Sequence, residues 1–138
     1  MKNCMRIHEI EEEARKLANL SAPPLCITLS GDLGAGKSTF ARAFIRAYLQ
    51  DHDLFVPSPT FTLVQMYESR EGHLLVHSDW YRLNSPEEIF QLGIPFQTAI
   101  TLIEWPEKAF CYLPSQRLDI QLLWIDEYHR TIQIQKTG

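Results

Sequence analysis

The sequence predicts an α/β fold in which a mixed, mainly parallel and twisted sheet is flanked by helices. Three observations lead to this class. Residues 25–29 form a short apolar run, a glycine-rich segment follows directly, and residues 39–50 carry apolar side chains at helical spacing. A strand, a glycine loop and a helix in this order form a unit typical of parallel sheets. A second uniformly apolar run at 99–103 predicts another buried strand in the same sheet.

The glycine-rich segment carries the strongest chemical signal. Residues 31–38 read GDLGAGKS, which fits the pattern G-x-x-x-x-G-K-[ST] and makes the fold class P-loop NTPase-like. Glycines let the backbone approach a phosphate closely, and N–H groups at a helix N-terminus favour its negative charge. We expect Lys37 to reach the β- and γ-phosphates and the Ser38 hydroxyl to ligate Mg²⁺. The expected nucleotide-binding residues are Gly31, Asp32, Leu33, Gly34, Ala35, Gly36, Lys37, Ser38 and Thr39.

The other elements follow from apolar periodicity and turn residues. Residues 7–20 have an apolar face and predict a helix that ends before two prolines. Ser85, Pro86 and Glu88 are typical of a helix start, and Gly93 is expected to end that short helix. A further short helix is expected at 106–112, and strands are expected at 61–67, 73–78, 118–124 and 131–135. The first two of these strands are expected to form a hairpin, and the last two are expected to add an antiparallel part.

Length and composition limit the class of protein. A chain of 138 residues is expected to form a single domain over residues 1–138. The net charge of −4 argues against a broad nucleic-acid-binding surface. No apolar run approaches the roughly 20 residues of a membrane span, and the N-terminus lacks the apolar core of a signal peptide. Three scattered cysteines fit free thiols in a reducing compartment, so we expect a cytoplasmic protein without a membrane contact.

Two acidic residues end predicted strands. Asp79 follows the apolar run that begins at Leu74, and Glu104 follows the run 99–103. Ligands of open α/β sheets lie at the carboxyl ends of the strands, and P-loop proteins place a Mg²⁺-associated acid there. Either acid fits this role, and spacing alone does not decide between them.

Three further residues lie near these acids in the sequence. His77 shares a strand face with Asp79, so it either touches the site or, as we expect, packs as a neutral strand histidine. Arg82 either stabilises charge in the transition state or, as we expect, forms an ion pair with Asp79 or with the glutamates at 87 and 88. Thr60 closes the loop after the P-loop helix, where switch-type NTPases place a threonine that senses the γ-phosphate, although Ser-Pro-Thr is also a good turn.

Missing motifs narrow the choice among P-loop proteins. No Asn-Lys-x-Asp segment for guanine is present, which favours ATP, and no Leu-Ser-Gly-Gly signature occurs. The chain has no arginine cluster and little room for the lid of a small-molecule kinase. These features favour a P-loop ATPase domain that acts on a protein partner. A nucleotide-gated adaptor with incidental hydrolysis and a small-metabolite kinase remain as alternatives.

Five segments together resemble one family. They read LSGDLGAGKSTF from Leu29, SPTFTLV from Ser58, HSDWYRL from His77, EE from Glu87 followed by LG from Leu92, and IEWPE from Ile103. In this order and spacing, over about residues 5–135, the chain resembles the bacterial TsaE (YjeE) family. The resemblance implies an ATPase required for threonylcarbamoyladenosine in tRNA. Family members work with the TsaB–TsaD pair, in which TsaD transfers the threonylcarbamoyl group, so tRNA is involved only indirectly.

The resemblance also implies roles for individual residues. Lys37 falls on the phosphate-binding lysine, and Ser38 and Glu104 fall on the Mg²⁺-associated hydroxyl and glutamate. Asp79 matches an essential aspartate that is a candidate for positioning the attacking water, and Thr60 matches the switch-like threonine. The expected catalytic residues are therefore Lys37, Asp79 and Thr60, with ATP and Mg²⁺ as cofactors. The chain departs from many relatives in having Ser at position 38 and in the residues that flank Asp79.

Overall fold

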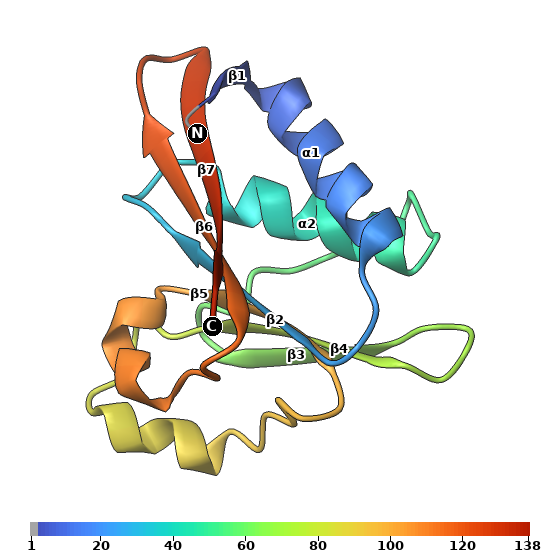
Figure 1. The fold of residues 1–138 in the computed structure, drawn as a ribbon, viewed down its shortest axis with the longest axis vertical. Coiled ribbons are helices and arrows are strands. Elements are labelled where there is room, and N and C mark those ends of the chain that lie inside the picture. Colours follow the sequence, from blue (N-terminus) through green and yellow to red (C-terminus); the bar gives the residue numbers. More distant parts are fainter. Residues whose placement is uncertain (1–2) are drawn as a thin grey trace.

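The computed structural model describes residues 3–138, which form a seven-stranded sheet with the order β1-β7-β6-β2-β5-β4-β3 (Figure 1). The strands are β1 Asn3–Arg6, β2 Leu25–Ser30, β3 Val64–Glu68, β4 Leu74–Asp79, β5 Ile100–Glu104, β6 Arg117–Trp124 and β7 His129–Thr137. The helices are α1 Ile7–Leu20 and α2 Lys37–Tyr48, with two short 3₁₀ helices, η1 Pro86–Gln91 and η2 Pro106–Tyr112.

The centre of the sheet is parallel and its borders are antiparallel. Strand β2 pairs in parallel with both β5 and β6, and β4 pairs in parallel with β5. The hairpins β3–β4 and β6–β7 and the pair β1–β7 are antiparallel. The predicted fold class and both predicted hairpins are confirmed. Because β2, β4 and β5 run in the same direction, their carboxyl ends meet at one edge of the sheet.

Helices α1 and α2 pack against each other over one side of the sheet, whereas η1 and η2 lie together on the other side (Figure 1). Alternation along the strands builds these two cores. In β2, Ile27 and Leu29 join the cluster that contains Phe40 and Phe44 of α2. Cys26 points the opposite way, into the smaller cluster around Trp80. Burial of apolar area on both faces therefore holds the P-loop strand in the middle of the molecule.

Several boundaries differ from the sequence predictions, and one strand is additional. Helix α2 begins two residues earlier, at Lys37, because Gly36 adopts a left-handed conformation and accepts the first helical hydrogen bond from Phe40 N, at 2.9 Å. Strand β3 begins at Val64 rather than at residue 61, because Leu63 has φ 68° and donates back to the Pro59 carbonyl. The short strand β1 was not predicted, since its four residues become a strand by pairing with β7.

The helix start at Ser85 has the expected capping contact, although the helix is 3₁₀. The Glu88 carboxylate accepts a hydrogen bond from Ser85 N at 3.2 Å. Within residues 3–138, no helix combines the length and the apolar character that crossing a membrane requires.

Candidate nucleotide-binding site

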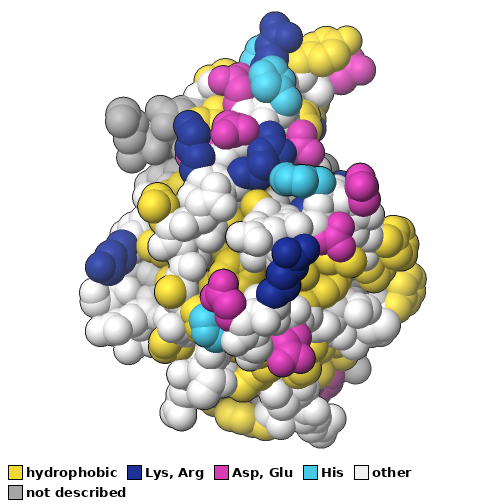
Figure 2. All heavy atoms as spheres, turned by 90° about the vertical axis from the view of Figure 1, so that its right-hand side faces the viewer, with side chains coloured by type: hydrophobic (Ala, Val, Ile, Leu, Met, Phe, Trp, Pro, Cys, Tyr) yellow, Lys and Arg dark blue, Asp and Glu magenta, His cyan; other side chains and the backbone are white. Residues whose placement is uncertain are grey.

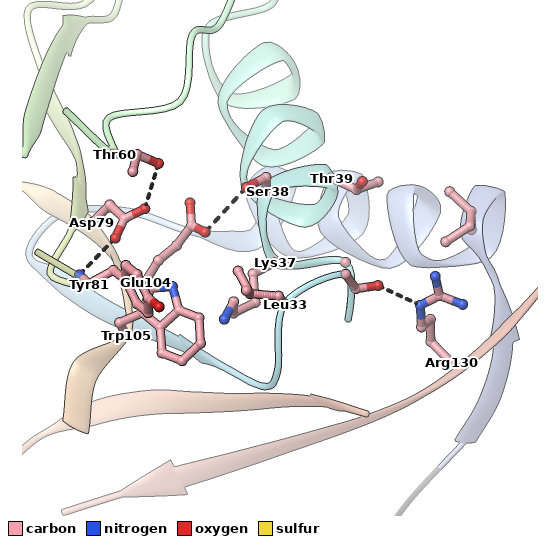
Figure 3. A pocket seen from close by; sticks show the side chains of 13 residues that line it. Leu33, Lys37, Ser38, Thr39, Thr60, Asp79, Tyr81, Glu104, Trp105 and Arg130 are labelled. Atoms are coloured by element: carbon pink, nitrogen blue, oxygen red, sulfur yellow. Dashed lines mark hydrogen bonds between the residues drawn. The ribbon is translucent and has the colours of Figure 1, made fainter. Parts of the chain in front are cut away.

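A cavity of about 350 Å³ lies where the glycine loop meets the carboxyl ends of β4 and β5 (Figure 3). Six of the nine predicted loop residues line it, together with all three predicted residues from elsewhere in the chain. Its lining consists of Ile7, Leu33, Gly34, Gly36, Lys37, Ser38, Thr39, Thr60, Asp79, Tyr81, Glu104, Trp105 and Arg130. The structure thus brings the glycine loop, the switch-like threonine and both strand-end acids to one place.

The other three loop residues support the loop from behind. A Cβ on Gly31 would lie 2.1 Å from the Leu122 carbonyl oxygen, so only glycine fits against β6 there. Ala35 is fully buried, and its N–H donates to the Asp32 carbonyl at 3.1 Å. On the cavity side, Gly34 and Gly36 lie beside the side chains of Leu33 and Lys37, and the two glycines let a phosphate approach the backbone closely.

The loop is anchored by a residue far along the chain. Arg130 of β7 donates from Nε to the Gly34 carbonyl at 3.1 Å and from Nη1 to the Asp126 carbonyl at 2.7 Å. Gly34 itself has φ 82°, a conformation that a side chain would strain. Sequence reasoning missed Arg130, and no local signal marks it, because 96 residues separate it from its partner in the loop.

Lys37 lies at the base of the cavity. Its Nζ donates to the Gly31 carbonyl and lies 3.3 Å from the centroid of the Trp105 ring. Burial lowers the pKa of Lys37, and the nearby carboxylates of Glu104, Glu107, Asp79 and Asp32 oppose that shift. A phosphate oxygen entering the cavity would offer this ammonium a stronger, charged acceptor than a carbonyl.

Glu104 has a different partner on each of its two carboxylate oxygens. Oε1 accepts a hydrogen bond from Ser38 Oγ at 3.3 Å, and Oε2 lies 2.6 Å from His77 Nε2. Both the glutamate and the histidine side chains are only 2% exposed. His77 is buried in strand β4, as expected, and it also contacts the acid at the site, which was the other possibility that the sequence left open.

Both carboxylate oxygens of Asp79 also accept hydrogen bonds, but their donors lie outside the glycine loop. Oδ2 accepts from Thr60 Oγ1 at 3.1 Å, and Oδ1 accepts from Tyr81 N at 2.9 Å. Ser58 Oγ lies 2.7 Å from Thr60 Oγ1 and extends this chain of polar groups (Figure 3 shows the Thr60 and Tyr81 bonds). Of the two acids, Glu104 is the one that reaches the P-loop hydroxyl.

The prediction of an ion pair for Arg82 is wrong. Within residues 3–138 its guanidinium pairs with no carboxylate, and it lies 4.2 Å from the centroid of the Phe61 ring. Sequence reasoning from the residues alone also missed Ile7 and Tyr81 as lining residues. Both have ordinary helix or turn surroundings in the sequence, and only the folded chain brings them to the cavity.

The fold and this arrangement define a P-loop α/β protein, in which a glycine loop lies at the carboxyl ends of parallel strands. The model of the family described as threonylcarbamoyl adenosine biosynthesis protein TsaE matches residues 4–132. The chain therefore belongs to the TsaE family, which is involved in tRNA threonylcarbamoyladenosine biosynthesis. The resemblance seen in the five sequence segments is confirmed.

Individual relatives agree with this assignment. The chain is 39% identical to the tRNA threonylcarbamoyladenosine biosynthesis protein TsaE of Rickettsia felis, over 94% of this chain and 78% of the relative. It is 35% identical to the Bacillus subtilis protein of the same name, over 92% of this chain and 82% of the relative. The crystal structure of Bacillus subtilis YdiB superposes with a TM-score of 0.77 at 28% identity, over 100% of this chain and 86% of that one.

Proposed function

We propose that this chain is a single-domain, Mg²⁺-dependent ATPase that supports threonylcarbamoyladenosine modification of tRNA by acting on a TsaB–TsaD complex. The observation that carries the ATPase proposal is the contact of Ser38 Oγ with Glu104 Oε1 beside the glycine loop. Membership of the TsaE family supports the pathway. The hydrolytic activity, the cofactors and the partner go beyond that membership and are the proposal.

The cavity has two chemically different ends. Thr60, Asp79 and Glu104 mark one end, and Arg130 marks the other (Figure 3). The phosphates would follow the loop amides, with the γ-phosphate toward the acids and the nucleoside toward the opposite end. Oxygen ligands suit a hard cation such as Mg²⁺, and Ser38 and Glu104 are the residues that would hold it. When bound, Mg²⁺ offsets charge on the β- and γ-phosphates.

The residues of the chain then have separable tasks. Lys37 exchanges the Gly31 carbonyl for phosphate oxygens and, with the loop amides, stabilises charge on the transferring phosphoryl group. Asp79 holds the attacking water beside the γ-phosphate. In the structure the Thr60 hydroxyl donates a hydrogen bond to the Asp79 carboxylate. When Thr60 contacts the γ-phosphate instead, that hydrogen bond breaks and Asp79 is free to bind the water.

The surface fits a protein partner better than direct tRNA binding. The net charge is −4, and on the face seen in Figure 2 positive side chains are interspersed with acidic ones rather than forming one basic surface. We therefore assign the contact to tRNA to the partner complex. One observation favours the adaptor alternative: Phe61, next to the switch-like Thr60, is 79% exposed and is available to a docking partner.

The test is ATP hydrolysis by the purified chain, alone and with TsaB–TsaD, with Lys37→Ala and a Mg²⁺-free sample as blanks. We expect hydrolysis that needs Mg²⁺ and that the partner stimulates strongly. Absence of hydrolysis under every condition, with nucleotide-dependent docking retained, would favour the adaptor. An ADP burst that depends on a small-molecule acceptor would favour the kinase.

A further inference from the structure

His77 is a buried polar side chain that the proposed mechanism does not use. It lies on β4, two residues before Asp79, and is 1% exposed. Its Nε2 lies 2.6 Å from Glu104 Oε2, a short contact for a nitrogen donor and a carboxylate. Placing two polar groups in the interior costs free energy unless each satisfies the other, so a specific contact is needed to retain them there.

The sheet register decides which part of Glu104 this histidine reaches. In the parallel pair β4–β5, Asp79 is opposite Glu104 and His77 is opposite Leu102. His77 therefore lies two residue pairs behind the acid, farther from the cavity, on the strand that carries Asp79. From that position it reaches Oε2, whereas Oε1 is left to face Ser38 Oγ at 3.3 Å.

A glutamate needs such a partner more than an aspartate does. Its side chain has three rotatable bonds, and holding it in one rotamer costs conformational entropy. The histidine ring is rigid and buried, and its contact with Oε2 selects the rotamer in which Oε1 faces the glycine loop. In metal sites, partners of this kind orient the ligands and contribute to metal affinity.

The hydrogen-bonding pattern identifies which ring nitrogen carries the proton toward Glu104. A carboxylate accepts, so Nε2–H of His77 is the donor. Nδ1 has no hydrogen-bond partner within residues 3–138. An unprotonated Nδ1 leaves only an acceptor unpaired, whereas an N–H there would be a buried donor without an acceptor.

We propose that His77 is a positioning residue: its Nε2–H holds the Glu104 carboxylate so that Oε1 and the Ser38 hydroxyl together form the cation-binding pair of the site. This inference rests on the proposed function, because it concerns the cation that accompanies the nucleotide. His77 acts through Glu104 and touches neither nucleotide nor cation.

Two substitutions separate this role from simple core packing. In His77→Gln the amide nitrogen occupies roughly the place of Nε2 and keeps a donor toward Glu104. In His77→Asn the amide lies near the place of Nδ1, so the donor no longer reaches Oε2. Both variants put a neutral amide into the same buried position, which makes the second a matched control for the first.

The measurement is the affinity for a fluorescent, non-hydrolysable ATP analogue, titrated with Mg²⁺ and repeated in EDTA. Loss of a partner behind a metal ligand typically lowers metal affinity about 10- to 100-fold. We therefore expect His77→Asn to raise the half-saturating Mg²⁺ concentration at least about tenfold. We expect His77→Gln to stay within about threefold of the wild type, and the affinity in EDTA to be the same for all three proteins.

Several results would overturn the proposal. Equal Mg²⁺ requirements for wild type and His77→Asn would remove any role for His77 in the cation site. Equal defects in the two variants, or a matching loss of affinity in EDTA, would reduce His77 to a packing residue. If the wild type shows no effect of Mg²⁺ on nucleotide affinity, the proposed function itself fails, and this inference fails with it.

A measurement on the wild type covers the case in which a variant does not fold. The ¹⁵N NMR spectrum of the histidine rings reports which nitrogen carries a proton. We expect His77 to show a protonated Nε2 that exchanges slowly with solvent. A ring without a proton on Nε2 would overturn the proposal without recourse to any substitution.

Discussion

The glycine loop and the acidic edge of the sheet form two halves of one cavity, but they are built differently. The loop is contiguous: residues 31–36 connect β2 to α2, Lys37 and Ser38 begin α2, and the expected roles follow from the order along the chain. The acidic edge is assembled from β4, β5 and the loop before β3, with Asp79 opposite Glu104 across two strands. A contiguous site can be read from a motif, whereas an assembled one depends on which partners the fold supplies.

The largest effect should come from removing the lysine of the contiguous half. Lys37→Ala takes away the ammonium at the base of the cavity and should lower ATP hydrolysis at least about 100-fold, since one lost charge-stabilising donor costs about that much. Steady-state ADP release with and without TsaB–TsaD measures it. Wild-type turnover in this variant would show that the loop is not the catalytic half.

A substitution in the acidic edge should lower the rate of ATP hydrolysis while leaving nucleotide affinity nearly unchanged. Asp79→Asn keeps the bond to Tyr81 N but removes the charge beside the proposed water, and should lower kcat about 100-fold. Nucleotide affinity should change less than about threefold, because Asp79 is assigned no contact with the bound phosphates. Nucleotide titration beside turnover assays checks this. A large loss of affinity with unchanged kcat would contradict the division of tasks.

A smaller effect, on nucleotide binding, is expected from removing Arg130, which anchors the glycine loop. Arg130→Gln removes most of the hydrogen bonds to the Gly34 and Asp126 carbonyls and should weaken nucleotide binding several-fold, since each lost bond is worth about 1 kcal/mol. Titration with an ATP analogue measures it, and Arg117→Gln, far from the cavity on β6, serves as the control. Equal effects in both variants would point to general destabilisation.

The smallest predicted effect lies outside the cavity and concerns stability. Although burial acts in the opposite direction, hydrogen bonds from Thr137, Thr28 and Arg117 keep the pKa of Asp119 below its ordinary value. Its folded-state pKa is therefore lower than its unfolded value. The stability it contributes is present above the unfolded pKa and is lost as the pH falls through the folded pKa.

Asp119→Asn should accordingly destabilise the protein by about 1 kcal/mol near neutral pH. It should also lose less stability than the wild type when the pH is lowered below about 4. Urea unfolding at several pH values measures both effects. If the free energies of unfolding of variant and wild type changed with pH in parallel, the Asp119 carboxylate would contribute no pH-dependent stability.

The sequence by itself determined the class of fold, the glycine loop, most helices and strands, and most of the residues that line the cavity. These features depend on near neighbours: alternation sets a strand face, a glycine permits a left-handed turn, and Lys37 and Ser38 follow the loop directly. Local patterns also sufficed for the hairpins, since their strands are adjacent in the chain.

Only the tertiary structure decided which partners the polar residues of the cavity contact. As strand ends Asp79 and Glu104 looked equivalent, and only the family resemblance gave them different roles. The fold supplies the contacts: Glu104 with Ser38 and His77, and Asp79 with Thr60. Arg130 became the anchor of the loop from 96 residues away. The physical reason is that a polar side chain takes its role from the groups within about 3 Å of it. For these residues, the folding of distant strands brings those groups into place.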